Sequence, residues 1–428
     1  MPERIAITGA QLICASGKSP AQALRSLLKG QTGISEITQF DTSAAGKLVG
    51  GEIADFTERE LVPDRKLHKL LRRYDFLGLY AGSGAVDSSG ASKFRDTLDS
   101  EQAEIFCDRT AIFTGSGGTA YRNSYAFLAV LASAGNDLQT FGRELESSVN
   151  PMWLLQTLPN NVLCHLGIRH GFKGVNSCIT NHSASGALAL IECAGAILAD
   201  DADRALAVAY ESPIEPQTLS YYRQVGLLSD SVPRPFDRAR NGAVLGEGAG
   251  ALMLERESAA RSRDADVIGW YLGGACTSEA GGVLPISPDG EGLERAIRDA
   301  LVAAELQPDD IGMVVAHGNG TVQSDVSEAR ALARVFNKAA PIITAFKWGI
   351  GHTLSASALL EAVLALEALA SGEAPGIATL TDPIDEARPL RIITRSAALE
   401  KKIVLVLSRG FGGMSTATAI AAADYAAS

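Results

Sequence analysis

Positive charge, long hydrophobic runs and cysteine are all scarce in this sequence of 428 residues. Lys and Arg number 38 against 49 Asp and Glu, and the resulting net charge of -11 argues against a nucleic-acid partner. No uncharged apolar run reaches the length that crosses a bilayer, and the N-terminal residues do not read as a signal peptide. We therefore expect a cytoplasmic protein that binds neither nucleic acid nor membrane.

Only six cysteines occur, and they are scattered along the chain. The sequence has no Cys-x-x-Cys pair and no Cys/His cluster at the spacing of metal ligands. A structural zinc site is therefore not expected, and the cysteine usage fits a reducing compartment.

The length exceeds one ordinary hydrophobic core and favours two domains. A polar, basic stretch over residues 259–266 is the best boundary, so we predict an N-terminal half, 1–258, and a C-terminal half, 259–428. In the second half, strands near 267, 312–316, 341–346 and 403–407 alternate with helices over 292–305, 324–337 and 355–371. This alternation predicts an α/β fold with a largely parallel sheet covered on both faces, and the two halves look like a structural duplication.

Cys178 stands in a polar turn before an Ala/Leu/Ile-rich segment whose apolar residues recur at helical spacing. The pattern predicts that Cys178 lies at or just before a helix start. There the unpaired N–H groups and the positive end of the helix dipole favour a thiolate, as a nucleophilic cysteine requires. A buried structural cysteine is the alternative, and for any single cysteine it is the more common case.

Three apolar strands of the second half each end in a polar loop that contains glycine. These loops carry His317, the pair Lys347 and His352, and the Gly-rich segment 408–413. Since the carboxyl ends of parallel strands share one edge of a sheet, we expect these groups to converge. Each has a plainer alternative: a structural histidine, a surface lysine instead of one paired with Glu361, and a simple turn instead of an oxyanion-binding loop.

Five motifs in order carry a resemblance over essentially the whole chain: Ser-Cys-x-Thr around Cys178, Arg-Pro-Phe-Asp through Gly-Glu-Gly-Ala-Gly at 234–250, His-Gly-x-Gly-Thr at 317–321, Lys-x-x-x-Gly-His at 347–352 and Gly-Phe-Gly-Gly at 410–413. The sequence resembles the elongating β-ketoacyl-acyl-carrier-protein synthases of the thiolase superfamily, relatives of polyketide ketosynthases. The resemblance implies a thiolase fold, a five-layered αβαβα core built from two similar halves, and usually a homodimer.

The resemblance also implies roles for individual residues. Cys178 would take the acyl group from a carrier thioester, and the backbone N–H groups of Cys178 and Phe411 would form the oxyanion hole. His317 and His352 would bind the thioester carbonyl of malonyl carrier protein and stabilise the enolate left by decarboxylation. Lys347, with Glu361, would support the two histidines, and no metal or organic cofactor is implied.

A cluster of basic residues falls where members of the family dock the acidic acyl carrier protein: Lys66, Lys69, Arg72 and Arg73. The residues themselves predict a long helix beginning at Lys66. Such a run is usually only a solvated face, and its alternative is a docking patch for an acidic partner.

Several positions depart from the pattern of the family. Arg409 stands where a gating Phe is usual, and Ile286 where a pantetheine-binding Thr would fall. Asn319 replaces the first Thr of the motif that ends at Thr321. Small residues usually fill the places of Asn181 and His182, which could bring a third imidazole near the nucleophile. The residues expected to shape the substrate pocket or its gate are therefore Arg409, His182, Asn181, Thr321 and Ile286.

The function expected from these features is decarboxylative Claisen condensation of an acyl thioester with malonyl-acyl carrier protein, in specialised fatty-acid or polyketide biosynthesis. Two alternatives remain at this point. One is a partner subunit that shapes the pocket of another ketosynthase in a heterodimer, and the other is a diverged acyltransferase that does not decarboxylate. The sequence leaves open whether the assembly is a homodimer or a heterodimer.

Overall fold

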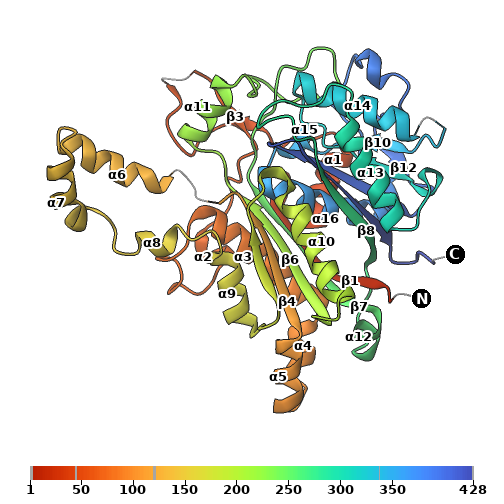
Figure 1. The fold of residues 1–428 in the computed structure, drawn as a ribbon, viewed down its shortest axis with the longest axis horizontal. Helices are drawn as coiled ribbons and strands as arrows, with labels where there is room; N and C mark the ends of the chain where they lie inside the picture. Colours follow the sequence, from red (N-terminus) through yellow and green to blue (C-terminus); the bar gives the residue numbers. More distant parts are fainter. Residues whose placement is uncertain (1–2, 44–45, 119–121, 337, 427–428) are drawn as a thin grey trace.

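A mixed sheet of ten strands forms the body of the computed structural model, which describes residues 3–43, 46–118, 122–336 and 338–426 (Figure 1). Its strand order is β10-β9-β13-β14-β8-β1-β7-β6-β4-β5. The first five strands of this sheet along the chain are β1 (Ile5–Cys14), β4 (Thr110–Ser116), β5 (Asn176–Ile179), β6 (Arg204–Glu211) and β7 (Gly248–Arg256). The second five are β8 (Gly269–Ser278), β9 (Met313–Val315), β10 (Ile342–Thr344), β13 (Ile403–Gly410) and β14 (Met414–Ala422).

The two groups of five strands repeat one topology. Numbered along the chain within its group, each has the spatial order 3-2-4-5-1, with two parallel pairings followed by two antiparallel ones. The groups join where Ile5–Ile7 of β1 pairs with Gly269–Tyr271 of β8. The sheet is therefore mixed, and the prediction of a largely parallel sheet is wrong. One reason is local: the connection 411–413 between β13 and β14 is short enough only for an antiparallel hairpin.

Five layers follow from the way the helices pack. α10 (Ser185–Leu198) and α16 (Ser357–Ser371) lie in the middle, in contact with each other and with strands of both groups. α3 (Arg73–Ser89), backed by α9 (Asn161–His170), covers the outer face of the first group. α13 (Glu291–Ala303) covers the second group, and α14 (Val322–Phe336) packs on α13. This is the αβαβα core expected from the resemblance, built from two similar halves.

The middle layer explains an unusually apolar segment. Within the described part of the chain, residues Leu354–Ser371 alone are long and apolar enough to cross a membrane, and 78% of that stretch is buried inside the protein. A helix with a sheet on either side must be apolar all round, so its composition follows from its position.

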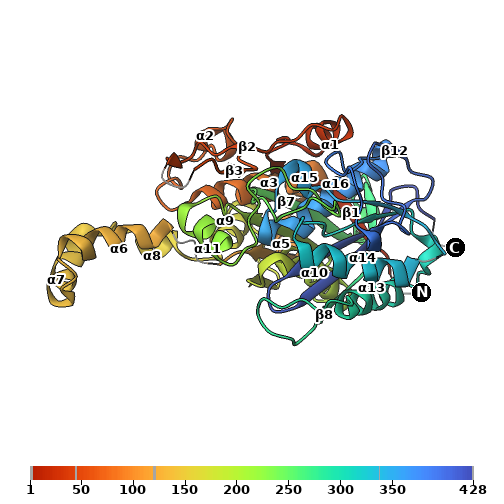
Figure 2. The same ribbon diagram turned by 90° about the horizontal axis from the view of Figure 1, so that it is seen from above.

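The remaining elements are short or peripheral. Figures 1 and 2 show α6 (Arg122–Ser133), α7 (Leu138–Ser148) and α8 (Trp153–Gln156) projecting from the body as an arm. The others are α1 (Pro20–Leu28), α2 (Glu58–Leu61), α4 (Ala91–Arg95), α5 (Ser100–Asp108), α11 (Pro216–Gln224), α12 (Glu257–Ser262), α15 (Lys347–Ile350), β2 (Ser35–Glu36), β3 (Val49–Gly50), β11 (Glu373–Ala374) and β12 (Ala397–Ala398).

Two helix boundaries differ from those expected. Turns occupy 65–70, and α3 begins only at Arg73, so the prediction of a helix from Lys66 is wrong. The backbone N–H of Arg72 donates to Asp75 Oδ2 at 2.8 Å, which satisfies the N-cap backbone and accounts for the later start. The helix predicted over 324–337 is α14, and Asn337 lies outside the described residues. The boundary between halves at 258/259 stays a prediction.

Candidate active site

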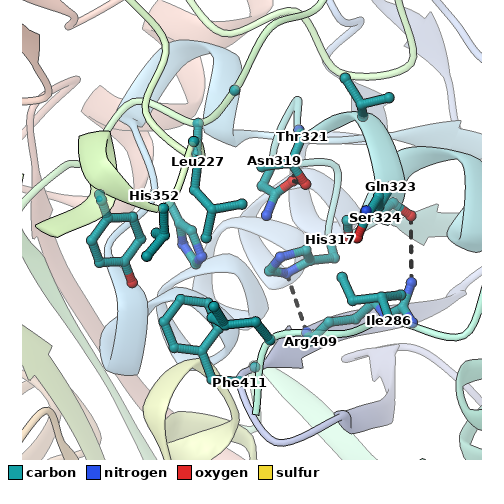
Figure 3. Close-up of a pocket in the computed structure, with 18 of the residues that line it drawn as sticks. Leu227, Ile286, His317, Asn319, Thr321, Gln323, Ser324, His352, Arg409 and Phe411 are labelled. Atoms are coloured by element: carbon teal, nitrogen blue, oxygen red, sulfur yellow. Dashed lines mark hydrogen bonds between the residues drawn. The ribbon is translucent and has the colours of Figure 1, made fainter. Parts of the chain in front are cut away.

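A cavity of about 760 Å³ opens at the carboxyl ends of β9 and β13. Figure 3 shows two imidazoles, those of His317 and His352, facing it from separate loops. The residues singled out in the sequence that line the cavity are His182, Ile286, His317, Asn319, Thr321, His352, Arg409 and Phe411. Strand ends far apart in the sequence thus converge, as parallel strands predict.

His317 follows β9 and is held through its own backbone. Glu328 of α14 accepts hydrogen bonds from the backbone N–H of His317 at 2.7 Å and of Gly318 at 2.9 Å. The backbone N–H of Arg409 donates to His317 Nδ1 at 3.2 Å (Figure 3). Since Nδ1 accepts, the proton of the neutral ring lies on Nε2, which makes Nε2 a hydrogen-bond donor.

His352 is held by the first half of the chain. Its backbone N–H donates to Val244 O at 2.7 Å, and its carbonyl accepts from Gly246 N at 3.0 Å. A Cβ on Gly246 would lie 2.3 Å from the carbonyl oxygen of Ile350, so only glycine permits this approach. The Gly-rich stretch within 234–250 therefore serves to position the second imidazole.

The two rings meet edge to face, with centroids 5.1 Å apart and an interplanar angle of 82°. His352 Nδ1 lies 3.0 Å from Ser357 Oγ. Burial lowers the pKa of both His317 and His352 well below the usual value, and the charge of Lys347 lowers both further. Both imidazoles are therefore neutral at pH 7.

Lys347 and Glu361 form a buried ion pair behind the histidines. Lys347 Nζ lies 2.7 and 2.9 Å from the two carboxylate oxygens of Glu361, and both side chains are at most 1% exposed. The pairing of α15 with α16 agrees with the partner predicted for Lys347. Burial raises the pKa of Glu361, while Lys347 acts in the opposite direction.

Arg409 lines the cavity, but its guanidinium forms an ion pair with Glu279. Its guanidinium lies 2.7 Å from Glu279 Oε1 and 3.4 Å from Ser324 O, and both ion-pair partners are 4% exposed. The residue that stands in the place of a gating Phe is thus a buried, paired cation that also supplies a backbone N–H to His317.

Cys178 does not join this site. It lies within the edge strand β5, seven residues before α10 begins, and its Sγ donates to Pro159 O at 3.2 Å. It is not among the residues that line the cavity. Burial raises the pKa of Cys178 above the usual value, so the thiol is favoured over the thiolate. The prediction of a helix-start thiolate is wrong, because Cys178 belongs to strand β5 and α10 begins only at Ser185.

Ser183 occupies the place where Cys178 was expected. It lies in the 3-10 turn His182–Ala184 directly before α10 and is fully buried. Ser183 Oγ is 3.3 Å from His352 Nε2 and 2.9 Å from His182 Nδ1, and its carbonyl accepts from Ser408 Oγ at 2.8 Å. The sequence does contain a signal for it, since the apolar spacing begins only at Ala187 and puts the preceding turn over 181–185.

The Gly-rich 410–413 loop packs on the Ser183 turn, not on Cys178. A Cβ on Gly410 would lie 3.3 Å from the backbone nitrogen of Ser183. The Phe411 ring stacks on His182 at a centroid distance of 4.2 Å. The predicted pairing of the Cys178 and Phe411 backbones is therefore not what the fold brings together.

Of the other residues predicted to shape the pocket, two line the cavity and one does not. Thr321 and Ile286 line the cavity, and Asn319 Oδ1 accepts from the Thr321 hydroxyl at 2.9 Å. Asn181 is not among the lining residues, and its backbone N–H donates to Ser185 Oγ at 2.7 Å. Asn181 thus belongs to the turn that carries Ser183.

Of the four basic residues expected to dock a partner, two are exposed and two are half-buried. Lys66 and Lys69 are exposed. Arg73 instead points inward, where its guanidinium pairs with the buried carboxylate of Glu247 at 2.5 Å, and Arg72 is half-buried. Since Arg73 is committed to a buried partner, the exposed charge of this patch comes from the two lysines.

The layered core built from two similar halves, with its site at the strand ends, defines the thiolase fold. Two family models match the chain: the β-ketoacyl synthase N-terminal domain over residues 2–260 and the C-terminal domain over 269–381. The chain therefore belongs to the β-ketoacyl synthase family.

Similar proteins of known name agree with this membership. The chain is 30% identical to 3-oxoacyl-[acyl-carrier-protein] synthase 2 of Synechocystis sp., with 96% of each covered. It is 28% identical to chloroplastic 3-oxoacyl-[acyl-carrier-protein] synthase I of Arabidopsis thaliana, with 98% of this chain and 87% of the relative covered. Among solved structures, the ishigamide ketosynthase/chain length factor matches with a TM-score of 0.87 at 24% identity over all of both chains, and a β-ketoacyl synthase of Burkholderia phymatum with 0.83 at 24% over 98% and 99%.

Proposed function

We propose that the protein catalyses the decarboxylative Claisen condensation of an acyl thioester with malonyl-acyl carrier protein, giving a β-ketoacyl carrier protein in specialised fatty-acid or polyketide biosynthesis. The observation that carries the proposal is the pair His317 and His352, kept neutral by burial in one cavity with rings 5.1 Å apart. Membership of the family and the names of the similar synthases support the same reaction.

The chemistry follows from the tautomer of His317. Its Nε2–H is a preorganised donor, because the Arg409 backbone occupies Nδ1. A donor at the malonyl thioester carbonyl stabilises the enolate that forms as the carboxylate leaves as CO2. His352 supplies the second donor, and the charge of Lys347, which pairs with Glu361, lowers the pKa of both rings and helps to keep them neutral. The enolate carbon then attacks the carbonyl of a bound acyl group and forms the new carbon–carbon bond.

The partners we propose are an acyl carrier protein and a second ketosynthase-type subunit, identical or related. Lys66 and Lys69 are exposed and supply positive charge for an acidic carrier. Arg73 is left out of this surface because Glu247 binds it.

A second candidate function has one observation in its favour. No cysteine is among the described residues that line the cavity. A partner subunit that shapes the pocket of another ketosynthase, and is never itself acylated, would need no thiol there. The neutral imidazole pair and its buried ion pair have no use in such a subunit, and they favour the enzyme.

The test is to incubate the protein with malonyl carrier protein and acyl carrier proteins of increasing chain length. Intact mass spectrometry of the carrier would then follow the product. We expect a β-ketoacyl carrier that retains two of the three malonyl carbons. Unchanged malonyl carrier at every chain length, alone and mixed with a related subunit, would leave the proposal without support.

A further inference from the structure

Ser183 is not itself among the residues that line the cavity, but its hydroxyl contacts the imidazoles of two that are, His182 and His352. It lies between two ring nitrogens, His182 Nδ1 at 2.9 Å and His352 Nε2 at 3.3 Å, and the side chain is fully buried. A hydroxyl has one proton to donate and accepts with its lone pairs. Ser183 Oγ can therefore donate to one imidazole and accept from the other.

The surrounding contacts suggest which ring takes the proton. The role proposed for His352 needs a proton on Nε2, which is then a donor towards Ser183 Oγ, with Nδ1 accepting from Ser357. That leaves His182 Nδ1, the nearer nitrogen, as the acceptor of the Ser183 proton. His182 Nε2 is 2.8 Å from Tyr222 OH, and this contact fixes the ring.

The backbone of His182 is itself unusual. Its φ is +47°, a left-handed conformation that a residue with a side chain adopts at a cost of about 1–3 kcal/mol. Stacking on Phe411 and the contact with Tyr222 hold the ring in place. Backbone strain of this kind is common at functional sites, where a side chain must be held in one orientation. Here the strained backbone directs the imidazole of His182 toward the hydroxyl of Ser183.

We propose that Ser183, and not Cys178, accepts the acyl group, as an oxygen ester, and that His182 is the base that activates it. This inference rests on the proposed function and names its nucleophile. A thiol ionises near neutral pH, whereas a hydroxyl needs an adjacent base. Ser183 as nucleophile therefore requires a base such as His182 next to it. This requirement explains why a histidine occupies a position where the family usually has a small residue.

The step balances in atoms and protons. Ser183 Oγ bonds to the acyl carbon while the carbon–sulfur bond of the carrier thioester breaks. The hydroxyl proton moves to His182 Nδ1 and on to the departing sulfur. In the condensation the enolate carbon bonds to the ester carbon, the Oγ–carbon bond breaks, and the seryl oxygen regains a proton from solvent water.

Peptide mapping of the protein after reaction with acetyl, octanoyl and dodecanoyl carrier protein tests the assignment. We expect the acyl mass on the peptide segment at Ser183, stable to neutral hydroxylamine, which cleaves thioesters. Ser183→Ala should lower acylation about 100-fold or more, whereas Cys178→Ala should acylate like the parent. An acyl group found on Cys178, or labelling that survives Ser183→Ala, would overturn the proposal.

The role of His182 needs a readout that structural damage would not mimic. His182→Phe keeps an aromatic ring to stack on Phe411 and should slow acylation roughly 10²–10⁴-fold. In a Ser183→Cys background the same change should cost far less, since the thiol ionises by itself. Equal losses in both backgrounds would contradict the base.

Release of CO2 from malonyl carrier protein by the parent protein separates this inference from the proposed function. Decarboxylation uses the imidazoles of His317 and His352, whereas acylation uses the Ser183 hydroxyl. CO2 release by the parent without an ester at Ser183 overturns the nucleophile alone. No CO2 release by the parent overturns the proposed function.

Discussion

Three imidazoles lie around one cavity: those of His317 and His352 are buried, and that of His182 is half-buried. Burial disfavours their charged forms: it lowers the pKa of His182 to about 4 and those of the other two well below the usual value. In the unfolded chain these three histidines bind protons with a pKa of about 6.5. In the folded protein they stay neutral at that pH. The stabilisation is therefore full above the unfolded pKa and is lost as the pH falls toward the folded one.

The free energy of unfolding should accordingly fall on acidification from pH 7 to pH 5. His182 alone contributes about 2 kcal/mol to that fall, from a folded pKa of about 4. Urea midpoints of the parent and of His182→Phe at the two pH values measure the difference. The variant should lose less stability than the parent, and an identical loss in both would show that His182 is not buried in its neutral form.

At the scale of elements, α15 and α16 are tied together by the Lys347–Glu361 pair, with both side chains out of water. Glu361→Ala would leave a buried ammonium without a partner and should destabilise the protein by about 3–5 kcal/mol. Glu291→Ala on α13 removes an exposed pair with Arg295 and should cost at most about 1 kcal/mol. Denaturation midpoints of the two variants compare the losses.

The double change Lys347→Met with Glu361→Leu separates stability from chemistry. It removes both charges and keeps apolar volume, so stability should return to within about 2 kcal/mol of the parent. CO2 release should remain at least about 10-fold lower, because the charge behind the histidines is gone. Full activity in the double variant would mean that the pair serves only the packing of α15 against α16.

Helices and strands can be predicted from the sequence where the apolar periodicity and the residues that end an element lie within the element itself. The position of a side chain cannot be predicted where it depends on contacts with distant parts of the chain. His317, Lys347 and His352 each follow a short apolar strand, and that pattern was enough to bring them to one edge. Cys178 was misplaced, because a cysteine in a small-residue turn looks the same within an edge strand as at a helix start. Arg73 looked like a surface cation, since nothing local announces its buried partner Glu247, 174 positions away.

At the scale of the whole molecule, the two halves meet at Gly186 in the middle layer, three residues after Ser183. A Cβ there would lie 2.9 Å from Ser355 O and 3.2 Å from Leu359 Cβ. α10 and α16 can therefore approach closely enough to put the Ser183 turn beside His352. The duplicated fold thus builds one site from both of its halves, and the distance between the middle helices sets its geometry.

Gly186→Ala should push the middle helices apart, at a cost of about 1–3 kcal/mol, and should lower acylation together with CO2 release. Gly195→Ala in the same helix is the matched control. Nothing lies within 4 Å of a Cβ on Gly195, so this change should be neutral or stabilise by up to about 1 kcal/mol. Thermal unfolding and both activities compare the variants, and equal behaviour would show that the helix contact does not set the site.

We expect loss of CO2 and formation of the carbon–carbon bond to be coupled at His317 and His352. The most direct measurement uses malonyl carrier protein labelled in its free carboxyl group, together with an acyl carrier protein, and counts labelled CO2 against β-ketoacyl carrier. The parent protein should give equal amounts of both, and both should be lost when His317 is changed to Ala. Acyl transfer that proceeds without labelled CO2 would contradict this expectation.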